Sequence, residues 1–164
     1  ALAARGYGAC DPSALYGAPV AAVALAAADE AAIHCEGPLA IMAEIWAAGG
    51  IGPARLAVMA RAAEPRVWLL GRLGQRPVAC AFAAVHGEVA VLHALEVAAE
   101  ARRRGMGALL TRAAAAWAQA HGATTLALAV TESNAPALAL YSGLGFGEIG
   151  RYHYRLAPEV RQDG

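Results

Sequence analysis

The segment Arg102-Arg103-Arg104-Gly105-Met106-Gly107-Ala108 combines three consecutive arginines with two glycines at the start of a helix-like stretch. Because glycine has no β-carbon, the backbone at a helix start can approach an anion closely and point unpaired N–H groups at it. Arginine side chains at this end of a helix oppose its dipole, at a cost of about 0.3 to 1 kcal/mol each. Three in succession therefore indicate that a polyanion binds at this turn.

The same turn matches two other phosphate sites only in part. A dinucleotide-binding turn needs a third glycine here and an acidic residue ending the next strand, and Thr124–Val130 does not end in one. A nucleoside-triphosphate loop needs Gly-Lys-Ser/Thr, which the sequence lacks. A solvated arginine run before an ordinary helix is the remaining alternative.

Three further side chains could move protons. His93 and Glu96 lie in the strand-like segment Val89–Val97, and Tyr141 lies in the helix-like segment Ala135–Ser142. A histidine with its ordinary pKa of about 6.5 is largely neutral at pH 7 and can accept a proton. Strand alternation puts Glu96 on the face opposite His93 unless a bulge intervenes, and bulges occur beside active sites.

Each of these residues also has an ordinary structural interpretation. His93 could be a hydrogen-bonded core histidine, Glu96 a salt-bridged strand residue and Tyr141 a packed aromatic ring. Asn134 precedes Tyr141 by seven residues, or about two helical turns, so both can face the same ligand.

The elements that must position these side chains begin at about Arg66. Hydrophobic patterns predict strands over 66–72, 78–85 and 89–97, joined by tight turns into an antiparallel meander. A helix over 105–121, a buried strand over 124–130 and a helix over 135–142 capped near Asn134 follow. Two short strands, 145–149 and 151–156, come last. This order predicts an α/β (α+β) fold, in which helices cover a mixed sheet.

Residues 1–60 are rich in glycine, proline and alanine, and their elements are harder to predict. A helix is expected over 38–46, where Gly49-Gly50-Ile51-Gly52 ends it, and Pro53 is well placed to begin another that runs to about residue 63. Segment 20–26 fits a strand or a helix, because its periodicity does not distinguish them.

Composition excludes several classes of function. Thirteen basic residues balance thirteen acidic ones, which argues against a general nucleic-acid or membrane surface. No apolar run reaches the roughly 20 residues of a membrane span, and the first residues do not form a secretory signal. The sequence has three cysteines, an odd number, and they are widely spaced: Cys10, Cys35 and Cys80. This pattern indicates neither a disulfide framework nor a zinc site. We expect a cytoplasmic protein without metal, nucleic-acid or membrane partners.

Two motifs in this order resemble the general N-acetyltransferase (GNAT) superfamily over about residues 66–156. Its Arg/Gln-x-x-Gly-x-Gly/Ala signature is matched by Arg102, Gly105 and Gly107. Its later Asn…Leu-Tyr…Leu-Gly-Phe pattern is matched by Asn134, Leu140, Tyr141, Leu144, Gly145 and Phe146. Either motif alone is moderately specific, and the two together, separated by a helix and a strand, are strong.

The resemblance implies a mainly antiparallel sheet with a V-shaped split between its two central strands, in which acetyl-coenzyme A binds. Backbone groups of Leu95, Glu96 and Val97 would pair with the pantetheine arm like an added strand. Residues 102–108 would hold the pyrophosphate, and Asn134 and Tyr141 would contact the same coenzyme.

The resemblance also implies direct attack of an amine on the thioester, which needs a base for the amine and a donor for the thiolate. Tyr141 is the expected donor. The segment His93-Ala94-Leu95-Glu96-Val97 is similar to a strand of arylalkylamine N-acetyltransferases, where the histidine helps to withdraw the amine proton. The partner histidine of those enzymes is replaced here by Val91. Glu96 is the competing base.

The expected acceptor is a small-molecule or peptide amine, which would enter beside Glu44, Trp46 and the bend at 49–52. Residues 1–60 would form this acceptor-side part, or the tail of a truncated upstream lobe. Residues 61–158 would form the acetyl-coenzyme A core, and 159–164 a tail. A homodimer is compatible with the sequence. A coenzyme A-binding regulatory module without catalysis is the alternative function.

Overall fold

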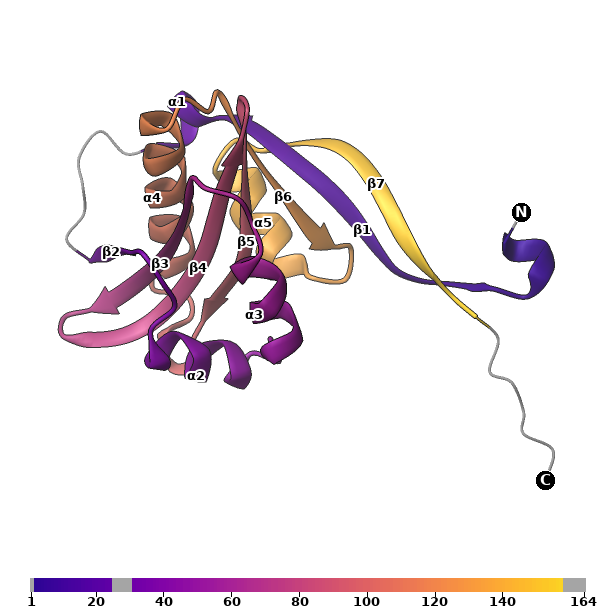
Figure 1. Cartoon of the computed structure of the whole chain (residues 1–164), viewed down its shortest axis with the longest axis horizontal. Coiled ribbons are helices and arrows are strands. Elements are labelled where there is room, and N and C mark those ends of the chain that lie inside the picture. The colour runs from indigo at the N-terminus through magenta and orange to yellow at the C-terminus, as the bar shows by residue number, and fades with distance from the viewer. Residues whose placement is uncertain (1, 25–30, 158–164) are drawn as a thin grey trace.

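The computed structural model describes residues 2–24 and 31–157, which form one seven-stranded sheet in the order β2-β3-β4-β5-β6-β1-β7 (Figure 1). Its strands are β1 (Gly8–Pro19), β2 (Ala32–Cys35), β3 (Arg66–Leu73), β4 (Arg76–His86), β5 (Val89–Val97), β6 (Thr125–Thr131) and β7 (Gly147–Leu156). Neighbouring strands pair antiparallel except β5 and β6, which are parallel. The predicted mixed, mainly antiparallel sheet is therefore confirmed.

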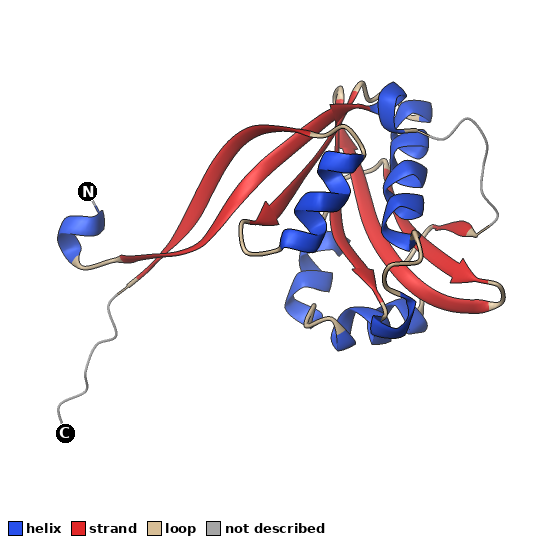
Figure 2. Cartoon of the chain, turned by 180° about the vertical axis from the view of Figure 1, so that it is seen from behind, coloured by secondary structure: helices blue, strands red, loops and turns tan. Residues whose placement is uncertain are grey.

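Helices cover both faces of the sheet. They are α1 (Val20–Val23), α2 (Ala40–Ala48), α3 (Pro53–Ala60), α4 (Met106–Ala120) and α5 (Ala135–Gly143), with 3-10 turns at Leu2–Arg5 and Ala99–Ala101. Figures 1 and 2, seen from opposite sides, place α2 and α3 on one face and α4 and α5 on the other. The central strands of the sheet thus lie between two layers of helices.

Alternation along β4 divides the core into two parts. Ala81 and Ala83 are fully buried in the cluster that contains α4, while Cys80 and Phe82 belong to the cluster that contains α2. The alanines face fully buried alanines of α4, among them Ala114. Small side chains on both surfaces let the helix pack close to the sheet.

One expectation for the end of the chain was wrong. The two short strands predicted after residue 145 are one continuous strand, β7, which pairs with β1 rather than folding back on itself. Residues 20–23 of the ambiguous segment 20–26 form a helix, and its last two residues lie outside the described part of the chain, as does the predicted tail at 159–164.

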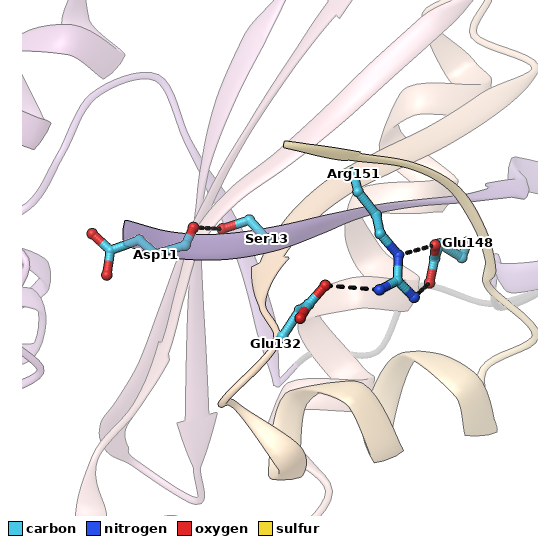
Figure 3. A network of polar contacts seen from close by, with 5 residues as sticks. All are labelled: Asp11, Ser13, Glu132, Glu148 and Arg151. Atoms are coloured by element: carbon cyan, nitrogen blue, oxygen red, sulfur yellow. Dashed lines mark hydrogen bonds and ion pairs between the residues drawn. The ribbon is translucent and has the colours of Figure 1, made fainter. Parts of the chain in front are cut away.

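Strand β1, near the start of the chain, lies between β6 and β7 and pairs with β7, the last strand. Strands β1 and β2 come from residues 1–60, so the predicted acceptor-side part shares the sheet with the predicted core. A network at the surface links β7 to the end of β6 (Figure 3): Arg151 donates to both carboxylate oxygens of Glu148, also on β7, at 2.7 and 2.9 Å and to Glu132, just after β6, at 2.9 Å.

Candidate active site

The sheet opens between its two parallel strands. The ladder between β5 and β6 runs only from Val89 opposite Thr125 to Val91 opposite Ala127, and beyond it the strands diverge. A cleft of about 380 Å³ lies at this opening, lined by residues of both diverging edges, including Leu95 of β5 and Val130 of β6. The V-shaped split expected from the sequence is therefore present.

A bulge in β5 decides which side chains reach the helices α2 and α3. Phe82 pairs with His93 and Cys80 with Glu96, so three steps along β5 oppose two along β4, and Ala94 takes a φ of 51°. The indole N–H of Trp46 donates to the Ala94 carbonyl at 2.7 Å, which satisfies a group that the bulge removes from the ladder. His93 and Glu96 consequently both contact residues from the α2 and α3 side.

His93 lines the cleft beside Arg55 of α3. The Nη1 atom of Arg55 lies 3.0 Å from the Nε2 atom of His93. A guanidinium can only donate, so Nε2 is the acceptor and the imidazole is neutral, with its proton on Nδ1. Burial, and secondarily the charge of Arg55, lower the pKa of His93 from its ordinary value.

Tyr141 and Asn134 reach the same cleft from α5. Tyr141 is 7% exposed and packs edge to face on Phe146, with ring centroids 5.6 Å apart. Burial raises the pKa of Tyr141 to about 12, so its hydroxyl keeps its proton throughout the neutral range. Asn134 caps α5, because its Oδ1 atom accepts from the Ala137 N–H at 3.1 Å. The fold thus brings His93, Leu95, Asn134 and Tyr141 together.

Glu96, Val97 and Arg102 line a neighbouring pocket of about 500 Å³ against α2. Arg102 turns back onto β5, where its Nε atom donates to the Val97 carbonyl at 3.2 Å and its Nη2 atom lies 3.3 Å from a carboxylate oxygen of Glu96. A β-carbon at Gly49 would lie 2.4 Å from that carboxyl group, so the glycine leaves room for it. Glu96 therefore lines this pocket and is not among the residues that line the cleft of His93.

The arginine-glycine turn connects the end of β5 to the start of α4. Gly105 is the N-cap of α4 with a φ of 81°, and no side chain caps this helix. A β-carbon at Gly107 would lie 2.9 Å from Leu140 of α5, so this glycine allows the two helices to approach. Arg103 and Arg104 are exposed, and within the described residues neither forms a salt bridge. Met106 is buried and Ala108 half-buried.

Several residues of the cleft were not predicted as site residues. They include Arg55 and, on the β1 side, Asp11 and Ser13, and nothing in the sequence pointed to these three. Tyr152 and Tyr154 of β7 also line the cleft; they belong to the segment 152–155, whose alternating aromatic and polar residues fit either an acceptor-facing strand or a cover for the sheet edge. Of the expected acceptor side, Glu44 lies in the pocket of Glu96, while Trp46 is fully buried and cannot contact an acceptor.

Residues 2–24 and 31–157 contain no group of three or more histidine, cysteine, aspartate or glutamate side chains placed to hold a metal ion. None of their helices is long and apolar enough to span a membrane.

Known proteins resemble this chain in sequence and in fold. A profile of the Acetyltransferase (GNAT) family matches residues 38–146. The uncharacterized N-acetyltransferase YobR of Bacillus subtilis is 38% identical over 60 residues, which make up 37% of this chain and 24% of YobR.

Among solved structures, a GNAT-family protein from Novosphingobium aromaticivorans is similar over 89% of this chain, at 21% identity and a TM-score of 0.67. A GCN5-related N-acetyltransferase from Kribbella flavida is similar over 98% of it, at 21% identity and a TM-score of 0.66. The chain spans 64% and 63% of the length of these two proteins. Because the profile matches about two thirds of the sequence, over the strands and helices that build the cleft, this chain belongs to the GNAT family of acetyltransferases.

Proposed function

We propose that the chain transfers an acetyl group from acetyl-coenzyme A to a primary amine by direct attack in a ternary complex. The observation that carries this proposal is the opening between β5 and β6, which ends at a helix whose N-cap is a glycine with a positive φ. One edge of the opening offers backbone groups to an extended amide, and the helix start offers N–H groups to a phosphate.

The residues of the opening fit acetyl-coenzyme A. Leu95, Glu96 and Val97 would pair with the pantetheine arm, and the turn at 102–108 would hold the pyrophosphate. Arg102 would then turn from the Val97 carbonyl to a phosphate, which is a stronger partner because it is charged. Asn134 caps α5 through its oxygen, so its amide nitrogen is the group left to reach the coenzyme.

Two side chains that line the cleft would serve as the general base and the general acid of the reaction. The neutral amine attacks the thioester carbonyl, the new C–N bond forms as the C–S bond breaks, and the amine gives up a proton. His93 would accept this proton on Nε2, and the Tyr141 hydroxyl would give its proton to the departing thiolate. We place Glu96 second as a base, because it lines the neighbouring pocket rather than the cleft.

The test is thiol release from acetyl-coenzyme A by the purified protein across a panel of amines, beside a calorimetric titration with coenzyme A. We expect binding and amine-dependent release of one thiol per amide formed. Tight binding without turnover on any amine would instead favour a coenzyme A-binding regulatory module. No binding would contradict both functions.

A further inference from the structure

Arg55 places a positive charge in the cleft without an acidic partner. Its side chain is exposed, and the hydrogen bond at 3.0 Å joins it to His93. Within the described residues no carboxylate lies within salt-bridge distance of Arg55. A guanidinium has five N–H donors in a planar fork, and one neutral imidazole nitrogen uses only one of them. Donors therefore remain for a ligand.

The rest of the cleft shows where a ligand of Arg55 would extend. Tyr152 and Tyr154 of β7 pack edge to face with ring centroids 5.6 Å apart and line the same cleft. The pKa of Tyr154 is raised, chiefly by a hydrogen bond with Tyr152, and the positive charge of Arg55 opposes this shift. Asp11 of β1 and Arg55 of α3 line the same cleft as the two tyrosines, and Arg55 lies beside His93.

Resting on the proposed function, we infer that the acceptor is an amine with a carboxylate close to its nitrogen, such as an α-amino acid, and that Arg55 binds this carboxylate. The fork of an arginine matches a carboxylate in a bidentate manner. Because Arg55 contacts His93 directly, a carboxylate on Arg55 would lie beside the group that takes the amine proton. An α-amino acid, whose carboxylate and nitrogen share one carbon, fits this arrangement.

Binding of the carboxylate would also free the base. In the structure the lone pair of His93 Nε2 is occupied by Arg55, so it is not available to an amine. A carboxylate that draws Arg55 away releases this lone pair next to the bound amine. The tyrosine rings would pack on the amino-acid side chain.

The test compares three acceptors that share a side chain: an amino acid, its carboxamide and its decarboxylated amine, for example phenylalanine, phenylalaninamide and 2-phenylethylamine. One such set of three acceptors is prepared for each standard amino acid, and every set is assayed with the wild type, Arg55→Gln and Arg55→Lys. We expect the wild type to prefer the acid. In Arg55→Gln we expect kcat/KM to fall about 10- to 100-fold more for the acid than for the two acceptors without a carboxylate. Arg55→Lys should recover part of the loss.

The matched control is Arg61→Gln, an exposed arginine at the end of the same helix and outside the cleft lining; it should behave as the wild type. Coenzyme A affinity of Arg55→Gln, measured by calorimetry, should also be unchanged. Equal turnover of all three acceptors by the wild type, or equal losses for all three in Arg55→Gln, would overturn this inference and leave the proposed function intact. Absence of turnover with every acceptor would overturn the proposed function itself.

Discussion

At the scale of single residues, the cleft holds a proton acceptor and a proton donor whose pKa values are shifted in opposite directions. Burial lowers the pKa of His93 and raises that of Tyr141, in each case because the uncharged form is favoured. One residue is therefore neutral and able to accept a proton while the other still carries one. Such a pair suits acetyl transfer at neutral pH.

Tyr141→Phe should separate catalysis from coenzyme binding. The variant keeps the ring that packs on Phe146 and loses only the hydroxyl. We expect kcat to fall about 100-fold, the lower end of general acid catalysis, with coenzyme A affinity nearly unchanged. Tyr16→Phe, a tyrosine of β1 outside the cleft lining, is the control. An unchanged kcat would reduce Tyr141 to a packing role.

His93 should set the acid limb of the pH profile. Its neutral form is the base and its pKa is lowered, so kcat/KM should rise with pH to a plateau with a midpoint below about 6.5, the ordinary value. The profile is measured at saturating acetyl-coenzyme A and corrected for the fraction of neutral amine. In His93→Gln the limb should disappear. If it persists there but disappears in Glu96→Gln, Glu96 is the base.

At the scale of elements, helix α4 offers a matched pair of glycines at its two ends. Gly105 and Gly122 have φ values of 81° and 85°, and a β-carbon at either would meet no atom within 4 Å. Valine at each should destabilise the fold similarly, by about 1 to 2 kcal/mol, because both must adopt a left-handed conformation. Only Gly105→Val should also weaken coenzyme A binding, by at least about tenfold. Equal affinities in the two variants, measured by calorimetry, would contradict the phosphate-turn prediction.

The elements that the sequence revealed are those with local patterns. Strand β5 was predicted with the bounds that the structure has, because its apolar run is limited by turns on both sides. Strand β1 was missed, since Gly8–Pro19 contains residues that disfavour strands and its bulge at Asp11 breaks the alternation. It forms because β6 and β7, more than 100 residues away in the sequence, supply its partners.

Residues of the candidate site differ in the same way. Asn134, Tyr141 and the arginine-glycine turn lie in contiguous motifs, so their types and spacing could identify them. The β5 bulge depends on Trp46 from α2, and the contact of His93 with Arg55 depends on where α3 packs. Contacts between distant segments leave no periodic signal in a single sequence, which is why Arg55 was not foreseen.

At the scale of the whole molecule, the front of the chain completes the sheet. Strand β1 pairs with β6 from Ser13 to Pro19 and is also the strand that pairs with β7. In Figure 1, β1 and β7 extend together away from the body of the domain. The profile match, residues 38–146, covers neither of them, although both contribute residues to the cleft.

A chain that starts at Val20 should therefore fail to fold, although it contains the whole matched segment. Without β1, strand β7 has no neighbour among the described strands, and β6 keeps only the short ladder to β5. The loss should exceed the roughly 5 to 15 kcal/mol that stabilises an ordinary domain. A chain starting at Tyr7 loses a 3-10 turn without buried residues and should unfold at the same denaturant concentration as the full chain.

Cooperative unfolding of the chain that starts at Val20, followed by circular dichroism, would refute this role of β1. Recovery of its fold by an added peptide of residues 8–19 would support the role, because the peptide restores hydrogen-bond partners to β6 and β7.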